Sequence, residues 1–221
     1  MTPLRIFIGW EPREADAFHV LAHSILTRAS RPVTITPLVQ SQLRAAGLYT
    51  RPPDPGASTE FSLTRFLVPH LAGYAGTAVF MDCDMLCQTD IAPLFQQEPG
   101  HAVWVCQHDY IPTTTVKMDG RPQVPYPRKN WSSLMVFDLQ HMGVRALTPD
   151  YVNRATPADL HRFAWLREGE LGALPLDWNW LVDEYAPNPA AKILHYTLGI
   201  PRLRPSTSHA TAWFEEAARV R

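Results

Sequence analysis

The sequence predicts an α/β fold: a single domain over residues 1–221, with a mostly parallel central sheet flanked by helices on both faces. Two observations support this prediction. Short apolar runs alternate with amphipathic segments from the first residues onward, which is the pattern of repeated strand–helix units. The chain has 221 residues, 46% of them hydrophobic and 19% charged, which is enough to bury one such core.

The predicted strands are short apolar runs bounded by glycine, proline or polar residues. In chain order they are Leu4–Gly9, Val33–Leu38, Thr77–Met81, Ala102–Gln107, Leu134–Asp138 and Lys192–His195. In sheets of this kind, ligands bind outside the carboxyl ends of the strands. Polar residues that directly follow a strand are therefore the first candidates for a functional site.

The predicted helices have apolar residues at helical spacing. In the first one, Pro12 suits the opening turn, and Phe18, Leu21 and Ile25 recur on one face up to about Ala29. The later helical segments are Gln40–Ala46, Glu60–Leu71, a single turn at Ile91–Phe95, Pro157–Leu166 and Ala210–Arg221. Two longer loops remain, Gly47–Ser58 and His108–Asn130.

Charge and composition exclude several classes of partner. The formal net charge of -1 gives no overall attraction to nucleic acid or to an anionic membrane. No apolar run approaches the roughly 20 residues of a transmembrane helix, and the N-terminus lacks the pattern of a cleavable signal. Three cysteines form no disulfide framework. We therefore expect a cytoplasmic protein with no nucleic-acid partner and no transmembrane segment.

Two carboxylates follow the most apolar strand. Asp82 comes directly after Thr77–Met81, and Asp84 lies two residues beyond it. Alternate residues of a strand point to the same side, so the two carboxylates are expected side by side, where their charges repel. A hard divalent cation such as Mg²⁺ or Mn²⁺, carrying phosphate oxygens, would neutralise them. The alternative is a pair of solvated aspartates in a turn.

The cysteines offer a second possible metal site. Cys83, Cys87, Cys106 and His108 are all residues that bind zinc. Cys83, however, alternates away from the two aspartates toward the packed side of the strand. A free, buried cysteine is the commoner arrangement, so we expect no zinc here.

Four motifs occur in an order that matches a known family. They are Arg5–Ile25, Phe61–Pro69, Phe80–Asp84 with Thr89–Ile91 after it, and His195–Gly199. With these motifs, the chain resembles the nucleotide-sugar glycosyltransferases of the GT-A type. Within that type it is most similar to family eight, the glycogenin and lipopolysaccharide galactosyltransferase group. The resemblance covers most of the chain.

The resemblance implies a metal-dependent transferase. Its donor substrate would be a nucleotide diphosphate sugar, with a UDP-hexose expected, and transfer would retain the anomeric configuration. The metal, Mn²⁺ or Mg²⁺, would be bound by Asp82, Asp84 and His195. The acceptor could be a saccharide, a lipid-linked sugar or a protein, and the oligomeric state is not implied.

Further roles follow from the same resemblance. Arg65 would contact the donor sugar or its diphosphate, Asp82 would lie near the ribose, and Gly9 and Trp10 would line the nucleoside pocket. On the side of the transferred sugar, Asp109 at the end of a strand and Asn179 are the candidate catalytic residues, together with Arg65.

The chain departs from the family pattern in three places, and two alternatives stay open. The acidic and amide pair that the family has before the segment Leu174–Asn179 is not evident here. Family members carry a lysine after the C-terminal histidine; here the stretch Gly199–Arg204 has only Arg202 and Arg204 to take its place. The Asn-x-Gly motif is replaced by the sequence Asn-Trp-Ser-Ser at 130–133. One alternative is a non-catalytic module that binds nucleotide sugars. The other is a haloacid-dehalogenase-type phosphatase with Asp82 as nucleophile and the acidic pair at 183–184.

Overall fold

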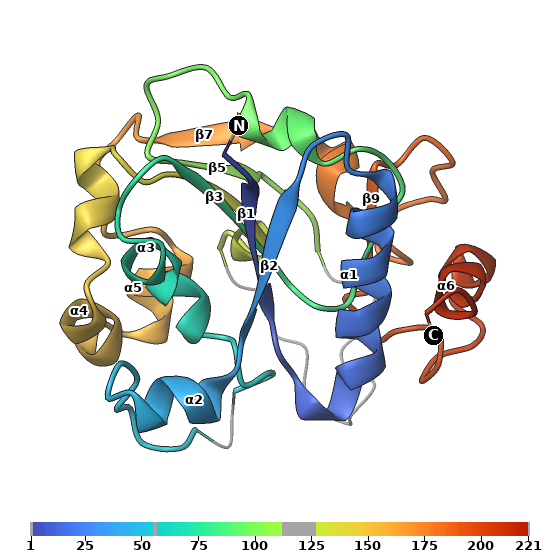
Figure 1. Cartoon of the computed structure of the whole chain (residues 1–221), viewed down its shortest axis with the longest axis horizontal. Helices are drawn as coiled ribbons and strands as arrows, with labels where there is room; N and C mark the ends of the chain where they lie inside the picture. The colour runs from blue at the N-terminus through green and yellow to red at the C-terminus, as the bar shows by residue number, and fades with distance from the viewer. Residues whose placement is uncertain (1, 55–56, 112–126, 221) are drawn as a thin grey trace.

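The computed structural model describes residues 2–54, 57–111 and 127–220. Its central sheet has six strands in the order β2-β1-β3-β6-β5-β7 (Figure 1). Their bounds are β1 Leu4–Gly9, β2 Val33–Leu38, β3 Thr77–Met81, β5 Val103–Cys106, β6 Leu134–Asp138 and β7 Leu171–Leu174. Strand β6 runs antiparallel to both of its neighbours, and every other pair is parallel. The prediction of a mostly parallel sheet is confirmed.

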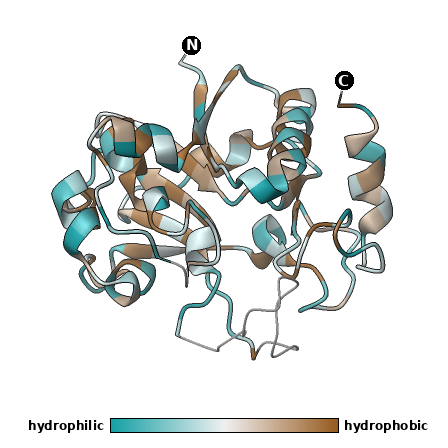
Figure 2. Ribbon diagram, turned by 90° about the horizontal axis from the view of Figure 1, so that it is seen from below, coloured by the Kyte–Doolittle hydropathy of each residue, from teal (hydrophilic) through white to brown (hydrophobic). Residues whose placement is uncertain are grey.

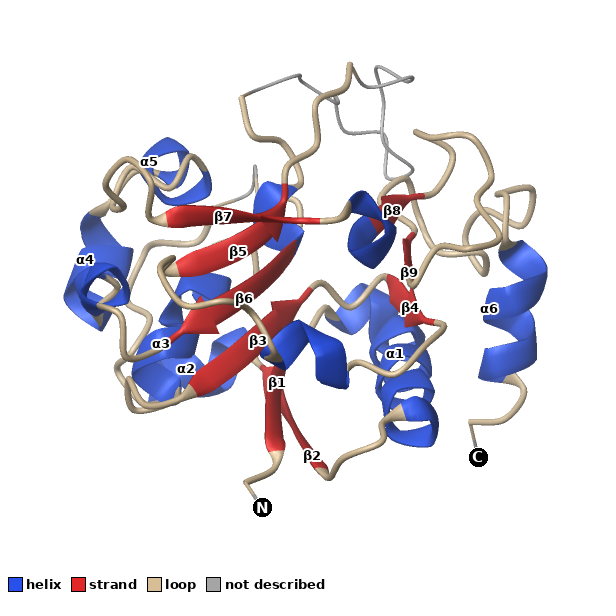
Figure 3. Cartoon of the chain, turned by 90° about the horizontal axis from the view of Figure 1, so that it is seen from above, coloured by secondary structure: helices blue, strands red, loops and turns tan. Residues whose placement is uncertain are grey.

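A second, smaller sheet has three strands in the order β4-β9-β8. They are β4 Met85–Cys87, β8 Trp180–Leu181 and β9 Ile193–His195. Figure 3 shows this sheet beyond the carboxyl end of β3, between the central sheet and helix α1. It joins a segment just after β3 to one near the end of the chain.

Helices flank the central sheet on both sides, as expected. Figure 1 shows α1 and α6 on one side and α2 to α5 on the other. The bounds are α1 Ala15–Arg28, α2 Gln40–Ala45, α3 Val68–Leu71, α4 Pro149–Arg154, α5 Pro157–His161 and α6 Ala210–Ala217. Short 3₁₀ turns are η1 Pro12–Glu14, η2 Thr64–Leu67, η3 Ala92–Phe95, η4 Trp131–Ser133, η5 Met142–Ala146 and η6 Leu176–Asn179. Among the described residues, no helix has the length and apolar character needed to cross a membrane.

The core is continuous between the two sheets. Strands β3 and β6 supply fully buried residues such as Val79 and Phe137, and Leu194 of β9 belongs to the same hydrophobic cluster. Figure 2 shows the hydrophobic residues gathered on the strands and the hydrophilic ones on the outer faces of the helices. This packing holds the ends of β3 and β9 in a fixed relation.

Three predicted helices are clearly shorter than the sequence pattern indicates, and one of them, predicted over Ala210–Arg221, ends at Ala217 as α6. The segment Glu60–Leu71 consists of turns, η2 and α3 instead of one helix. Pro69 has no backbone N–H to donate to the Arg65 carbonyl, and the N–H of Val68 donates to it instead, in a tighter turn. The predicted helix Pro157–Leu166 ends at His161 because Phe163 has a left-handed φ of 55°.

Candidate active site

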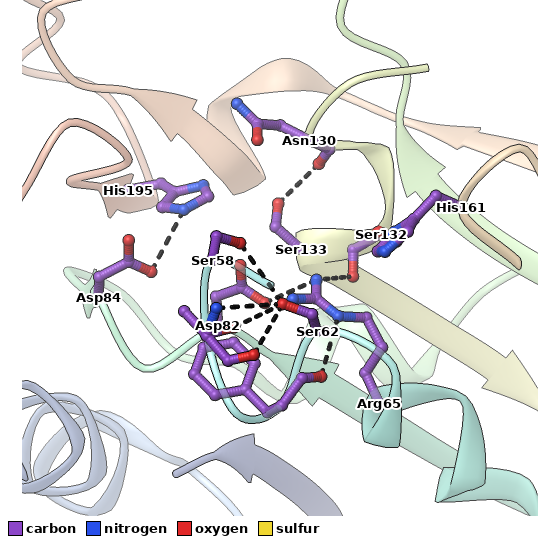
Figure 4. Close-up of polar contacts among 12 residues, drawn as sticks. Ser58, Ser62, Arg65, Asp82, Asp84, Asn130, Ser132, Ser133, His161 and His195 are labelled. Carbon is purple, nitrogen blue, oxygen red and sulfur yellow. Dashed lines mark hydrogen bonds and ion pairs between the residues drawn. The ribbon is translucent and has the colours of Figure 1, made fainter. Parts of the chain in front are cut away.

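A cleft of about 270 Å³ lies at the carboxyl end of β3. Its walls come from six parts of the chain: η1, the segment from Ser58 through η2, the turn that holds Asp82 and Asp84, the residues around η4, His161, and the segment that begins at His195. Asp82, Asp84, His195 and Arg65 all line it, so the fold brings together four of the residues predicted to form the site. Figure 4 shows their side chains pointing toward one another.

Asp82 and Asp84 occupy the turn between β3 and β4. The sequence pattern placed them side by side through the alternation of a strand, whereas in the structure a turn positions them. Their carboxylates still face the same cleft, while Cys83 between them is fully buried. One ligand atom from each of Asp82, Asp84 and His195 lies within 4.8 Å of the others.

The small sheet brings His195 to Asp84. In the antiparallel pair β4–β9, Met85 lies opposite His195, and the N–H of Tyr196 donates to the carbonyl of Asp84 at 2.9 Å. The backbone of the two residues is therefore fixed before any ligand binds. As a result His195 Nε2 lies 3.3 Å from Asp84 Oδ1 (Figure 4).

A chain of hydrogen bonds behind the cleft determines which nitrogen of His195 carries the proton. The Ser133 hydroxyl donates to the Asn130 carbonyl at 2.6 Å, so its oxygen accepts from Asn179 Nδ2 at 2.8 Å. This orients Asn179 with Oδ1 toward His195 Nδ1, at 2.9 Å. Because an amide oxygen only accepts, Nδ1 carries a proton, which makes Nε2 the nitrogen that would bind a metal from the cleft.

The residues present fit a hard divalent cation. Two carboxylates and an imidazole nitrogen with its lone pair facing the cleft are a donor set suited to Mn²⁺ or Mg²⁺. In the part of the chain that the structure describes, this is the group of side chains able to hold a metal, and it contains no cysteine. Cys83, Cys87 and Cys106 are buried, and burial raises the pKa of each thiol.

Arg65 lies against Asp82. Its Nη1 is 2.8 Å from Asp82 Oδ1 and donates to the carbonyl of Ser132 at 2.9 Å. The guanidinium also lies over the rings of Phe61 and Phe80, with its central carbon 5.3 Å and 4.9 Å from their centroids. Arg65 therefore neutralises Asp82 from within the wall, and its predicted contact with the donor stays a prediction.

Gly9 and Trp10 lie beside the cleft without lining it. A Cβ on Gly9 would meet the ring of Phe61 at 2.3 Å, so the glycine makes room for that ring. The Trp10 indole packs edge-on against Phe18. The residues of this loop that do line the cleft are Arg13 and Glu14. A nucleoside contact by Gly9 or Trp10 remains untested.

The two candidate catalytic residues on the sugar side have different environments. Asn179 is fully buried and contacts His195 from behind, which supports a role in orienting the imidazole. Asp109 is exposed and is not among the residues that line the cleft, so its proposed role stays a prediction. Much of the loop that follows, residues 112–126, lies outside the described residues.

Asp183, which would serve the phosphatase alternative, is engaged elsewhere. Its carboxylate accepts hydrogen bonds from the Thr207 hydroxyl at 2.5 Å and the Ser208 N–H at 2.9 Å, which hold the C-terminal loop. It does not line the cleft. Glu184, the other residue of the acidic pair, does not line the cleft either.

Several residues that line the cleft escaped prediction, among them Arg13, Glu14, Ser62, Ser132, Ser133 and His161. Their one sequence signal is position: Arg13 and Glu14 follow β1 at the sheet edge where ligands bind. Burial, and after it the charge of Asp84, raises the pKa of Glu14 to about 8. The charges of Glu11 and Asp82 raise this pKa as well, so the surroundings of Glu14 are negatively charged and favour cations.

No protein-family model matches the chain. Protein CDI of Arabidopsis thaliana is 48% identical over 205 residues, which are 90% of this chain and 79% of that protein.

Among solved structures, the WbbM bifunctional glycosyltransferase superposes with a TM-score of 0.65 at 15% identity. The match covers 99% of this chain and 50% of WbbM, so the chain spans half the length of that protein. The galactosyltransferase LgtC, solved with donor and acceptor sugar analogues, gives a TM-score of 0.61 at 11% identity and is covered over 96% of its length, with 98% of this chain. These likenesses show that the chain has the GT-A fold, as predicted.

The hydrogen bond from His195 to Asn179 yields a first prediction. Replacing Asn179 by Leu removes the acceptor that orients the imidazole, and we expect the affinity for Mn²⁺ to fall about 10–100-fold. Asn179→Asp keeps an acceptor oxygen and serves as the matched control, with affinity near that of the wild type. Calorimetric titration with Mn²⁺ measures both, and equal affinities for the Leu variant and the wild type would contradict the assigned tautomer.

His161 yields a prediction about pH. Burial, and after it the charge of Arg65, lowers the pKa of His161 to about 3, whereas an ordinary histidine titrates near 6.5. As pH falls below 6.5, His161 becomes protonated in the unfolded chain but stays neutral in the folded protein, so the free energy of unfolding decreases. At about pH 5, this group alone should cost roughly 2 kcal/mol of unfolding free energy.

Urea unfolding of the wild type and of His161→Gln, at about pH 7.5 and at about pH 5, measures this effect. The Gln side chain can still bond Ser132, whose hydroxyl lies 2.8 Å from His161 Nδ1. The variant should lose less stability between the two pH values than the wild type. The same loss in both proteins would show that His161 is protonated in the folded state.

Proposed function

Since the chain belongs to the family of Protein CDI and has the GT-A glycosyltransferase fold, we propose that it transfers a sugar from a nucleotide diphosphate sugar to an acceptor. The observation that carries the proposal is the group of Asp82, Asp84 and His195 in a cleft at the end of β3. We propose a UDP-hexose as donor and transfer with retention, because family eight, which the motifs resemble, works in this way.

Asp84 and His195 would hold Mn²⁺ or Mg²⁺, with Asp82 beside them. When bound, the ion would act as a Lewis acid that stabilises negative charge on the diphosphate leaving group. The residues of the chain prepare this site. Asn179 keeps the Nε2 lone pair of His195 directed into the cleft, and Arg65 offsets the charge of Asp82, so the second carboxylate can remain ionised close by.

The proposal leaves the acceptor open. A saccharide, a lipid-linked sugar and a protein are all compatible with an open cleft at the carboxyl end of β3. The donor half of the site therefore provides the sharper test.

We expect the affinity for UDP to rise when Mn²⁺ is added, and UDP to be released slowly from UDP-glucose or UDP-galactose through transfer to water in the absence of an acceptor. Asp84→Asn removes one ligand charge and should abolish the Mn²⁺ dependence of UDP binding and lower UDP release at least about 100-fold. Asp150→Asn, on the exposed surface of α4, is the matched control. Calorimetry and a coupled assay for UDP provide the two measurements.

The other outcomes distinguish the alternatives. Metal-dependent UDP binding without turnover, even with a panel of acceptors, would support the non-catalytic binding module. Hydrolysis of p-nitrophenyl phosphate that is lost in Asp82→Asn would support the phosphatase. UDP binding that is equal with and without Mn²⁺ would contradict the proposed function.

A further inference from the structure

The cations that line the cleft are few, and their positions assign them different tasks. In the described ranges 2–54, 57–111 and 127–220, no lysine lines the cleft, and its arginines are Arg13 and Arg65. A leaving diphosphate gains negative charge, which cationic donors stabilise in addition to a metal. The chain must therefore supply that charge from one of these arginines or from another part of the fold.

Arg65 is held in the wall of the cleft by its contacts with other side chains. Its side chain is only 6% exposed, it pairs with Asp82, and two aromatic rings enclose it. Moving it toward a ligand would break its 2.8 Å ion pair with Asp82. Arg65 can support the site but is poorly placed to follow a ligand.

The two arginines that occupy the position of the family's lysine point elsewhere. Arg202 Nη1 lies 2.8 Å from Asp16 Oδ2, and Arg204 lies 3.8 Å from Asp183. Neither lines the cleft. The expectation that one of them would replace the lysine is therefore not supported by their positions.

Arg13 combines access with a fixed position. Its side chain is 53% exposed at the rim of the cleft. Its Nε donates to Glu11 Oε1 at 2.7 Å, and its Nη2 donates to the Ser58 carbonyl at 2.9 Å. Glu11 is itself buried and fixed, since its other oxygen accepts from the N–H of Glu60 at 3.0 Å. These contacts set the plane of the guanidinium before a ligand arrives.

From this arrangement we infer that Arg13 binds the diphosphate of the donor and so takes over the task of the absent lysine. The inference rests on the proposed function and adds a residue to it. A guanidinium presents its donors as a planar fork that matches two phosphate oxygens, whereas an ammonium is a point charge. Glu14, the next residue, faces the charge of Asp84, which places this loop at the metal-ligand group.

The test compares UDP with uridine, which shares the nucleoside but has no phosphate. UDP binding in the presence of Mn²⁺ is measured by calorimetry, and uridine binding by ligand-observed NMR. For Arg13→Gln we expect UDP affinity to fall about 10–100-fold, with uridine affinity and Mn²⁺ affinity unchanged. Arg13→Lys should recover part of the loss. Arg202→Gln, which removes an exposed arginine paired with Asp16, is the matched control and should bind UDP like the wild type.

Each other outcome overturns the inference in a recognisable way. Unchanged UDP affinity in Arg13→Gln, in a wild-type background that binds UDP with Mn²⁺, rejects the role of Arg13 and leaves the proposed function standing. An equal loss of UDP and uridine affinity assigns Arg13 to the nucleoside. A wild-type protein that binds no UDP with Mn²⁺ rejects both the inference and the proposed function. Unchanged Mn²⁺ affinity also shows that the variant is folded.

Discussion

The rest of the site depends on one electrostatic constraint, the placement of two carboxylates in a single turn at the end of β3. Asp82 and Asp84 repel each other, and burial, together with their charges, raises the pKa of the nearby Glu14 to about 8. Arg65, whose Nη1 lies 2.8 Å from Asp82 Oδ1, reduces this electrostatic repulsion from within the protein. The arginine in turn depends on Phe61, whose ring fits only because Gly9 has no side chain. Packing at the end of β1 thereby determines the charge balance of the cleft.

The small sheet positions His195 next to the other carboxylate, Asp84. Pairing of β4 with β9 joins the residue after Asp84 to His195, and the buried chain through Asn179 and Ser133 sets the proton of the imidazole. With Nδ1 bonded to Asn179, Nε2 of the imidazole lies 3.3 Å from Asp84 Oδ1, where one cation could contact both atoms. We therefore propose that the fold separates two tasks: Arg65 offsets Asp82, and the Asp84–His195 pair holds an ion.

The sequence predicted the strands that consist of distinct apolar runs, and it missed the short strands and the site residues that depend on tertiary contacts. Strands β1, β2, β3 and β6 match their predicted bounds because each is a distinct run of apolar or β-branched residues. Strands β4, β7 and β8 have two to four residues and carry no periodicity of their own; tertiary pairing creates them.

The segment 60–71 looked helical, yet Pro69 breaks it. His195 was identified only through the family resemblance, since nothing local indicates that β9 pairs with the segment after Asp84. Arg13 and Ser133 gave no signal beyond position, because their roles follow from contacts distant in sequence.

The central claim is that Asp84 and His195 share one divalent cation, and the most direct measurement is anomalous X-ray diffraction from crystals grown with Mn²⁺ and UDP. The account predicts an anomalous peak in the cleft, about 2.0–2.3 Å from His195 Nε2 and from a carboxylate oxygen of Asp84, with diphosphate oxygens completing the coordination. A peak bound elsewhere, or ordered UDP in the cleft with no peak beside His195, would contradict it.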